Sequence, residues 1–94
     1  MSPRATDSTA RRAPCFVYIL RCKDGTLYTG WTADVAARER AHNAGRGAKY
    51  TKGRRPVRVV YQEAHETRSA AQKREARLKR GTRAQKAALI ASRG

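Results

Sequence analysis

Glu75 lies in a position where a carboxylate needs a partner. The spacing of Ala71, Glu75 and Leu78 would put all three on one stripe of a helix, while the rest of that segment is mostly Gln, Lys and Arg. The stripe is expected to face the interior, where an isolated carboxylate is costly. Spacing alone leaves two interpretations equally open: an ion pair with an arginine, or a ligand for a hard cation such as Mg²⁺ or Mn²⁺, which prefers oxygen donors.

Arg38 and His42 form a second pair that could do chemistry. With Val35 they fall at i, i+3 and i+7 of a predicted helix, and therefore on one inward stripe. Arg38 offers a forked donor that matches two phosphate oxygens, and His42 titrates near neutral pH and can move a proton. An Arg and a His one turn apart are also common by chance, so the pair alone indicates no function.

Tyr18 and Tyr28 lie in two segments, residues 15–22 and 26–32, that are rich in β-branched and aromatic residues. Both segments are expected to be strands, and the first is apolar on both faces, which is typical of a central strand. A tyrosine hydroxyl can act as a base if nearby cations lower its pKa. Packing in the core is the ordinary role of a tyrosine in a strand, and it remains open for both.

The loop between these strands decides whether the two tyrosines face the same side. A two-residue turn would put them on opposite faces of the sheet. A three-residue loop at residues 23–25, with Gly25 in the left-handed conformation, pairs Tyr18 with Gly30 and puts both tyrosines on one face. We favour the three-residue loop, in which Gly30 leaves room for a ring or a substrate phosphate.

Periodicity and capping residues predict the remaining elements. A third strand is expected over residues 57–64, and helices are expected over residues 34–44, from Thr67 or Ser69 to Arg80, and over residues 83–92. The order β-β-α-β-α-α predicts a small α+β sandwich. One domain over residues 15–92 would follow a disordered basic arm at residues 1–14.

Charge is the strongest signal in the composition. Twenty-two Lys and Arg against seven acids give the 94 residues a formal net charge of +15 at pH 7. A compact body with this charge repels itself unless a polyanion offsets it, and phosphate contacts favour Lys and Arg whatever the base sequence. Nucleic acid is therefore the expected partner. A ribosome-linked structural role rests on charge alone, and no segment pairs a basic face with the apolar face that a membrane surface would need.

A basic loop is predicted over residues 45–52 and continues towards the third strand. Its candidates for nucleic-acid binding, with Tyr50 as a stacking platform, are Lys49, Tyr50, Lys52, Arg54 and Arg55. A merely solvated loop is an equal alternative. No segment reads as a membrane span or signal peptide, so the cytoplasm is the expected compartment. Cys15 and Cys22 are expected to be small core or half-buried residues rather than a disulfide.

Taken together, these residues resemble the GIY-YIG nucleases. The segments FVYIL and LYTGWT carry tyrosines ten residues apart, similar to the two motifs that name the family. Arg38 follows Tyr28 by ten residues, His42 follows four residues later, and Glu75 in KREARLK resembles the metal-binding glutamate of the family. The resemblance extends over about residues 15–90. The resemblance is greatest to small stand-alone bacterial members, which carry sequence segments similar to YILRC, LYTG and GAKYT.

The resemblance implies a small α/β sandwich with a central three-stranded antiparallel sheet flanked by helices. It also implies endonuclease activity on a phosphodiester, with one Mg²⁺ or Mn²⁺ held by Glu75. Arg38 would stabilise charge at phosphorus. His42 and one tyrosine would handle the proton of the attacking water, and we favour Tyr18 over Tyr28 as the base. DNA is preferred to RNA as the substrate, with low sequence specificity because no targeting domain is expected.

A non-catalytic alternative stays open. Many relatives carry a polar residue, often Asn, near the end of the domain, whereas here the last Asn is Asn43, so turnover is expected to be weak. The alternative is a nucleic-acid-binding module that keeps a nuclease fold. If the chain is an enzyme, the five residues should converge on one cleft, and the Glu75 carboxylate should be open to solvent and unpaired by arginine.

Overall fold

β1 (Cys15–Arg21) is the central strand of a three-stranded antiparallel sheet in the order β2-β1-β3, as its apolar run predicts. The structure is a computed structural model that describes residues 14–93, so most of the predicted arm lies outside the described residues. The seven elements are β1, β2 (Leu27–Thr32), α2 (Val35–Asn43), α3 (Lys49–Lys52), β3 (Arg58–His65), α4 (Arg68–Lys79) and α5 (Arg83–Arg93). The predicted α+β order is confirmed, with α3 added.

The hairpin between β1 and β2 has the predicted three-residue loop. The Cys22 N–H donates to Thr26 O at 2.9 Å, and the Gly25 N–H donates to Cys22 O at 2.9 Å. Gly25 has φ +86°, the left-handed conformation that this loop requires and that glycine adopts without strain. The register pairs Tyr18 with Gly30, and both tyrosines therefore face the same side of the sheet.

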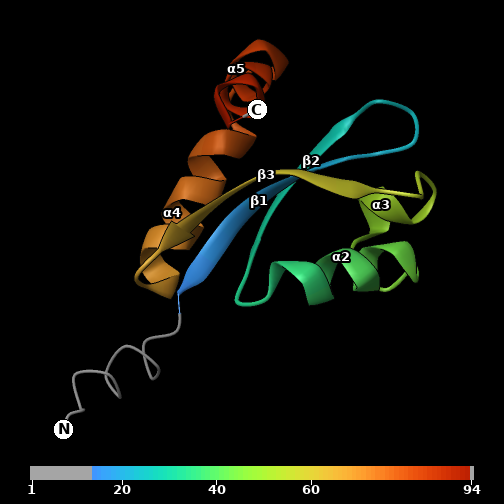
Figure 1. Cartoon of the computed structure of the whole chain (residues 1–94), viewed down its shortest axis with the longest axis horizontal. Helices are drawn as coiled ribbons and strands as arrows, with labels where there is room; N and C mark the ends of the chain where they lie inside the picture. The colour runs from blue at the N-terminus through green and yellow to red at the C-terminus, as the bar shows by residue number, and fades with distance from the viewer. Residues whose placement is uncertain (1–13, 94) are drawn as a thin grey trace, which may run out of the picture.

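The helices cover the sheet in two layers. α2 and α3 lie on one side, and α4 and α5 lie on the other (Figure 1). Asp34 begins α2 by accepting a hydrogen bond from the Ala37 N–H at 3.0 Å, and Gly45 with φ +84° follows its end. Thr67 caps α4 in the same way, through the Ala70 N–H at 3.0 Å.

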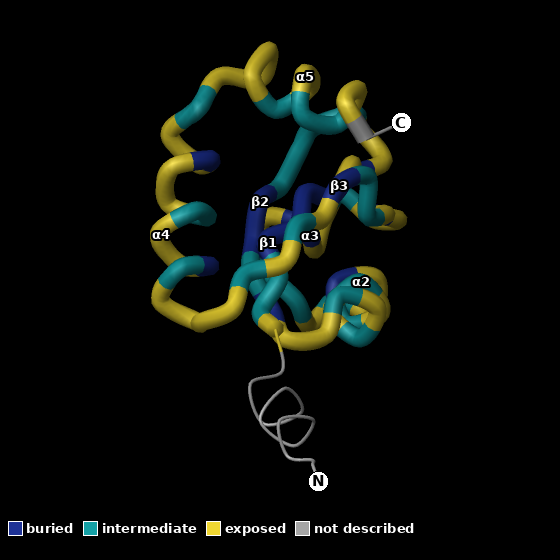
Figure 2. Tube along the Cα trace, turned by 60° about the vertical axis from the view of Figure 1, so that its left-hand side comes forward, coloured by how far each residue is buried: buried dark blue, intermediate teal, exposed yellow. Residues whose placement is uncertain are grey.

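Two apolar clusters hold these layers to β1. On the α2 side, Tyr18 and Leu20 pack with Val57, while on the α4 side Val17 packs with Ala71 and Leu78. Figure 2 shows the buried positions gathered on the strands, with the outer side of α4 exposed. Cys15 is half-buried and Cys22 is buried, and both are free thiols, as expected. Within residues 14–93 no helix combines the length and apolar character that crossing a bilayer demands.

The predicted loop at residues 45–52 is in part a helix. α3 is a single turn, opened by Ala48 in an extended conformation and closed at Gly53. Thr51 is 0% exposed and anchors the turn to the core, while Lys49, Tyr50 and Lys52 point outward. A single turn carries too little sequence for helical periodicity to identify it, so its buried threonine is what gives it a fixed place.

Candidate active site

The site is built around a hydrogen-bond chain that joins β1, α2 and α3. The hydroxyl of Tyr18 lies 3.0 Å from Nε2 of His42. Nδ1 of His42 lies 2.8 Å from Oγ1 of Thr51, and the Thr51 hydroxyl lies 3.0 Å from the Ala48 carbonyl oxygen. Tyr18, His42 and Thr51 are all at most 1% exposed. This series of hydrogen bonds therefore lies in the core rather than on the surface.

The direction of each hydrogen bond follows from the end of this chain. A carbonyl oxygen only accepts, so the 3.0 Å contact directs the Thr51 hydroxyl proton to Ala48 O, which also accepts from the N–H groups of Thr51 and Lys52. Thr51 Oγ1 then accepts from His42, which puts the imidazole proton on Nδ1. Nε2 is left as an acceptor, and the Tyr18 hydroxyl donates to it. His42 is thus arranged to receive the proton of Tyr18.

Tyr28 is close to the same imidazole. Its ring meets the His42 ring edge-on with centroids 5.3 Å apart, and it stacks with the Tyr50 ring at 5.8 Å and 27°. The Nζ atom of Lys79 lies 5.7 Å from the Tyr28 ring centroid. Tyr28 therefore links the buried histidine to the half-exposed surface formed by α3 and α4.

Arg38 reaches this site from the rim. Val35 packs against the core and His42 is buried, as predicted for their stripe, but the Arg38 side chain is exposed. Its guanidinium is still close enough to act on both neighbours, because it favours the ionised form of Tyr18 and disfavours the charged form of His42. Arg38 is available to a ligand that approaches from solvent.

Burial dominates the protonation of the buried pair. Desolvation raises the pKa of Tyr18 to about 12, and the nearby Tyr28 and Glu75 add to the rise while Arg38 opposes it. This is opposite to the lowered pKa that the sequence suggested for a tyrosine base. Desolvation, followed by Arg38, lowers the pKa of His42, so its imidazole is neutral near pH 7. Near pH 7 the pair is therefore a neutral tyrosine beside a neutral imidazole, and the imidazole lone pair is the one available to accept a proton.

Glu75 lies beside this cluster on α4. It shares the helix with Ala71 and Leu78, which are 0% and 6% exposed, as the stripe predicted. Its ion pair is with Lys79, at 3.4 Å, and within residues 14–93 no arginine pairs with it. Its side chain is 20% exposed, so the carboxylate is partly open to solvent. The five candidates thus meet around a buried hydroxyl rather than in the open cleft that was expected.

Glycines form two walls of the site. A Cβ on Gly30 would lie 2.5 Å from the Tyr18 hydroxyl oxygen, so the tyrosine ring occupies the space that the register predicted. A Cβ on Gly47 would lie 2.2 Å from Nδ1 of His42. The backbone at both positions touches the side chain of a candidate residue, and any larger residue would displace it.

The basic residues near the site divide into two groups. Lys49 and Lys52 on α3 are exposed and have no acidic partner among the described residues. Arg54 pairs with Asp24 at 3.1 Å and lies 4.0 Å from the Tyr50 ring centroid, so this ring is partly covered. Arg55 donates to backbone carbonyls of Lys52 and Asn43, at 2.8 and 3.2 Å. These two arginines help to fix the fold as well as add charge.

Three contributors to the site were missed by the sequence analysis: Thr51, Gly47 and Lys79. Gly47 and Thr51 both lie in the GAKYT segment, which was interpreted through its charges. The signal that could have identified them was the presence of a small residue, Gly47, and a hydroxyl-bearing residue, Thr51, in an otherwise basic loop. Lys79 follows Glu75 by four residues, a spacing at which ion pairs form on helices.

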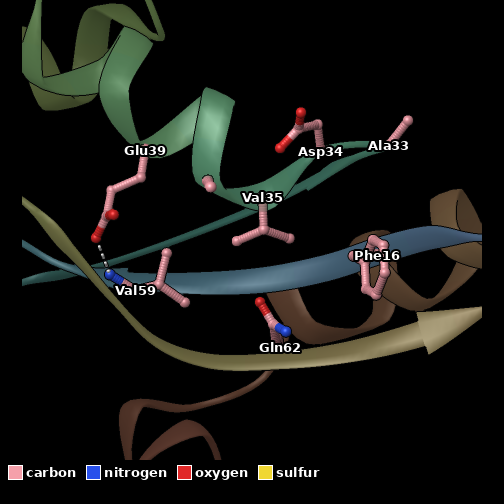
Figure 3. Close-up of a pocket in the computed structure, with 8 residues that line it drawn as sticks. Phe16, Ala33, Asp34, Val35, Glu39, Val59 and Gln62 are labelled. Atoms are coloured by element: carbon pink, nitrogen blue, oxygen red, sulfur yellow. Dashed lines mark hydrogen bonds between the residues drawn. The ribbon is translucent and has the colours of Figure 1, made fainter.

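A pocket of about 460 Å³ opens between α2 and the strands, apart from the five candidate residues (Figure 3). Both carboxylates on its wall bind backbone, since Glu39 accepts from the Val59 N–H at 2.8 Å and Asp34 caps α2. None of the five candidates lines it. This pocket therefore offers no free catalytic group.

Within residues 14–93, no group of three or more His, Cys, Asp or Glu side chains is placed to hold a metal ion. Glu75 alone offers a carboxylate at the Tyr18 site. Mg²⁺ is often bound through one or two carboxylates together with water and substrate phosphates. The donor set thus fits an ion that is completed by a phosphate ligand and does not fit a metal cage made by the protein alone.

Comparisons with known proteins agree on one family. Residues 14–88 match the GIY-YIG catalytic domain. A UPF0213 protein of Staphylococcus aureus strain Mu3 is 59% identical over 78 residues, which cover 83% of this chain and 95% of that protein. The UPF0213 protein of strain Mu50 matches with the same figures. These names state no activity.

A solved structure is similar to the fold as well as to the sequence. The solution NMR structure of a UPF0213 protein from Bacillus halodurans superposes with a TM-score of 0.56 and 43% sequence identity. The match covers 86% of this chain and 86% of that chain. Both comparisons span nearly all of the described residues.

Proposed function

The chain belongs to the GIY-YIG catalytic domain family, and from this premise we propose that it is a metal-dependent endonuclease that hydrolyses phosphodiester bonds. DNA is the preferred substrate over RNA, and sequence specificity is low. The observation that carries the proposal is the meeting of Tyr18 with His42, at 3.0 Å, in a place where Arg38 and Glu75 act on the same hydroxyl. Three elements that are distant in sequence, β1, α2 and α4, supply these side chains.

In this proposal His42 is the general base and Tyr18 is its relay. As water attacks phosphorus, the Tyr18 oxygen takes a proton from the water while the Tyr18 hydroxyl gives its own proton to Nε2 of His42. The bond from phosphorus to the leaving oxygen breaks, and that oxygen takes a proton from solvent. Tyr18 is neutral before and after this step, which fits a hydroxyl whose pKa is about 12.

Arg38 is proposed to bind the phosphate. Its exposed guanidinium can donate two hydrogen bonds to the non-bridging oxygens, where negative charge grows in the transition state. A Mg²⁺ or Mn²⁺ ion at Glu75 would supply Lewis-acid chemistry at the same phosphate. For that, the Glu75 carboxylate has to exchange its ion pair with Lys79, which is weak because both side chains are partly exposed.

Excess charge supports a nucleic-acid substrate. The net charge is +15, and Lys49 and Lys52 extend outward from α3 next to the site. Phosphate contacts by such residues give affinity without base recognition. Tyr50 is 39% exposed and stacks with Tyr28, so it is a candidate contact for a base near the scissile phosphate.

The test is cleavage by the purified chain of labelled duplex, single-stranded and branched DNA, and of RNA, with Mg²⁺ or Mn²⁺. Glu75→Gln should lower metal-dependent cleavage by about a hundredfold or more, of the order lost when one group that stabilises transition-state charge is removed from an active site. Glu66→Gln is the matched control, because Glu66 is exposed and lies outside the site. Cleavage that survives in Glu75→Gln would refute the assigned role of Glu75.

The binding module remains the second candidate, because one observation favours it. The ion pair between Lys79 and Glu75 supplies the carboxylate with a cation from the chain itself, so the site has no obligatory need of a metal. A binding module predicts salt-sensitive binding of nucleic acid that needs no metal, and no cleavage of any substrate in the panel. Metal-dependent cleavage by the wild-type chain would exclude it.

A further inference from the structure

We propose that Thr51 is a positioning residue that sets the tautomer of His42 and thereby the direction in which Tyr18 gives up its proton. The inference rests on the proposed function for its catalytic consequence. Its structural half, the tautomer of a buried histidine, stands without any activity. No sequence match or resemblance assigns a role to this threonine.

The polar surroundings of His42 leave this task to Thr51. Of the two ring nitrogens, Nε2 faces Tyr18 at 3.0 Å and Nδ1 faces Thr51 at 2.8 Å. The other neighbours are the Tyr28 ring, the Arg38 guanidinium, whose charge acts on the imidazole, and the Gly47 backbone, which is too close for a Cβ to fit between. Within residues 14–93, Thr51 is therefore the hydrogen-bond partner of Nδ1.

The contact of Thr51 with the Ala48 carbonyl favours Thr51 as the acceptor of the imidazole proton. The Thr51 hydroxyl proton is used by the Ala48 carbonyl, at 3.0 Å. Because the residue is 0% exposed, water cannot replace either bond. In the opposite tautomer, Nδ1 would need a donor, and Thr51 could supply one only by turning its proton away from the Ala48 carbonyl, which also accepts from the backbone N–H groups of Thr51 and Lys52 at 3.2 and 3.1 Å. The one-turn helix α3 thus acts as a fixed hydrogen-bond acceptor built into the wall of the site.

The tautomer decides what His42 can do. With the proton on Nδ1, the lone pair of Nε2 accepts the Tyr18 hydroxyl, and the relay can run from water through Tyr18 to His42. With the proton on Nε2, His42 would donate to Tyr18, and the tyrosine would have no base beside it. A hydroxyl 9 positions along the chain therefore controls whether the pair is a base or a plain hydrogen bond.

Thr29 provides a matched control for the loss of a hydroxyl. It is a buried threonine, 2% exposed, whose Oγ1 has no hydrogen-bond partner among the described residues. Thr29→Val and Thr51→Val make the same chemical change in the same core. Only the second removes the partner of His42. Thr51→Ser keeps the hydroxyl and loses a methyl group.

The experiment is long-range ¹H–¹⁵N NMR of the histidine rings in the full chain, with His65→Gln used to assign the two histidines. The proton of neutral His42 is expected on Nδ1 in the wild type, Thr29→Val and Thr51→Ser. In Thr51→Val it should move to Nε2, and kcat should fall roughly tenfold to a hundredfold, by analogy with the loss of the partner that orients a metal-binding histidine. KM should change much less, and Thr51→Ser should restore kcat.

Each outcome decides the matter. A proton on Nε2 in the wild type overturns the inference without any variant, and so does a Thr51→Val protein that keeps Nδ1 protonated. Thr51→Ala is measured alongside in case the valine variant does not fold. If the wild type cleaves nothing, the nuclease proposal fails while the tautomer result still decides the role of Thr51. A tautomer that shifts with no loss of kcat would overturn the catalytic half of the inference alone.

Discussion

The Tyr18 hydroxyl lies 3.0 Å from Nε2 of His42, a contact that ties the central strand β1 to α2 across one face of the sheet. Each residue is 1% exposed, so the bond is made in the core. A buried hydrogen bond that loses one partner leaves the other unsatisfied, at a cost of about 1–3 kcal/mol. The candidate base is thus also part of what holds the two layers together.

Tyr18→Phe should abolish the relay while keeping the ring. We expect a fall in kcat of about a hundredfold or more, the usual range for a positioned proton-transfer group, together with a loss of stability of about 1–3 kcal/mol because Nε2 is left unpaired. Cleavage assays and urea denaturation measure the two effects. Tyr61→Phe is the control, since Tyr61 donates to Glu63 at 2.5 Å, outside the site, and its loss should leave kcat unchanged.

The pH dependence should reveal a histidine with a lowered pKa. Because burial lowers the pKa of His42 from 6.5, neutral His42 is retained to a pH below 6.5, and the acid limb of kcat/KM should have its midpoint there. The unfolded state binds more protons in this window, so stability falls as the pH drops below about 6.5. If kcat/KM already falls as the pH is lowered through the alkaline range, the midpoint of the acid limb lies too high for His42 to be the base.

The stability part of this prediction has its own control. Urea denaturation between pH 5 and 7.5, roughly the range around the ordinary pKa of histidine, should give a slope that His42→Gln removes. The lowered pKa values of Asp24 and Glu63 affect stability at a lower pH than His42 does. The stability that these carboxylates contribute is lost only as the pH falls through and below the ordinary carboxyl pKa range. The two effects are therefore separable by pH.

Lys79→Met should make Glu75 easier for a metal to reach. The ion pair at 3.4 Å joins side chains that are 49% and 20% exposed, so its removal should change stability by less than about 1 kcal/mol. With the competing cation gone, the Mg²⁺ concentration for half-maximal cleavage should fall several-fold. Lys73→Met, an exposed lysine on the same helix, controls for the change in net charge. Equal metal requirements in both variants would argue against Glu75 as the ligand.

Gly47→Ala should damage the site, whereas Gly53→Ala should not. A Cβ at position 47 would meet Nδ1 of His42 at 2.2 Å, so the ring must move, with an overpacking cost of about 1–3 kcal/mol and a loss of kcat. A Cβ at position 53 meets nothing within 4 Å, and Gly53 has φ −93°, which alanine tolerates. Thermal denaturation and kcat compare the two. Similar losses in both variants would mean that the close packing on His42 is unimportant.

The hairpin and the helix stripes could be predicted because local sequence encodes them. Gly25 favours the left-handed position of a three-residue loop, and that loop length sets the register that brings Tyr18 and Tyr28 to one face. The positions of Ala71 and Leu78 follow from helical spacing alone. Elements with several turns or a defined turn residue carry enough signal for such inference.

Other features depend on packing that no local pattern contains. α3 is one turn long, and the contact of Thr51 with His42 joins two elements across a loop, so neither has a periodic signature. Arg38 lies on an inward stripe, yet its length carries the guanidinium to the rim. The pKa of Tyr18 depends on whether burial or the nearby cation dominates, which only the three-dimensional arrangement determines.

The burial of the reacting pair has a consequence for the resting protein. With 1% of Tyr18 and 1% of His42 exposed, bulk water has almost no contact with the pair, so under the proposed function the free chain would be latent. In that case an incoming nucleic-acid strand would have to rearrange the rim before a water molecule could be activated, and part of its binding energy would be used in doing so. Ligands too short to make those outer contacts should bind poorly and leave the chemistry switched off, so discrimination by substrate length would arise from gating rather than from reading bases.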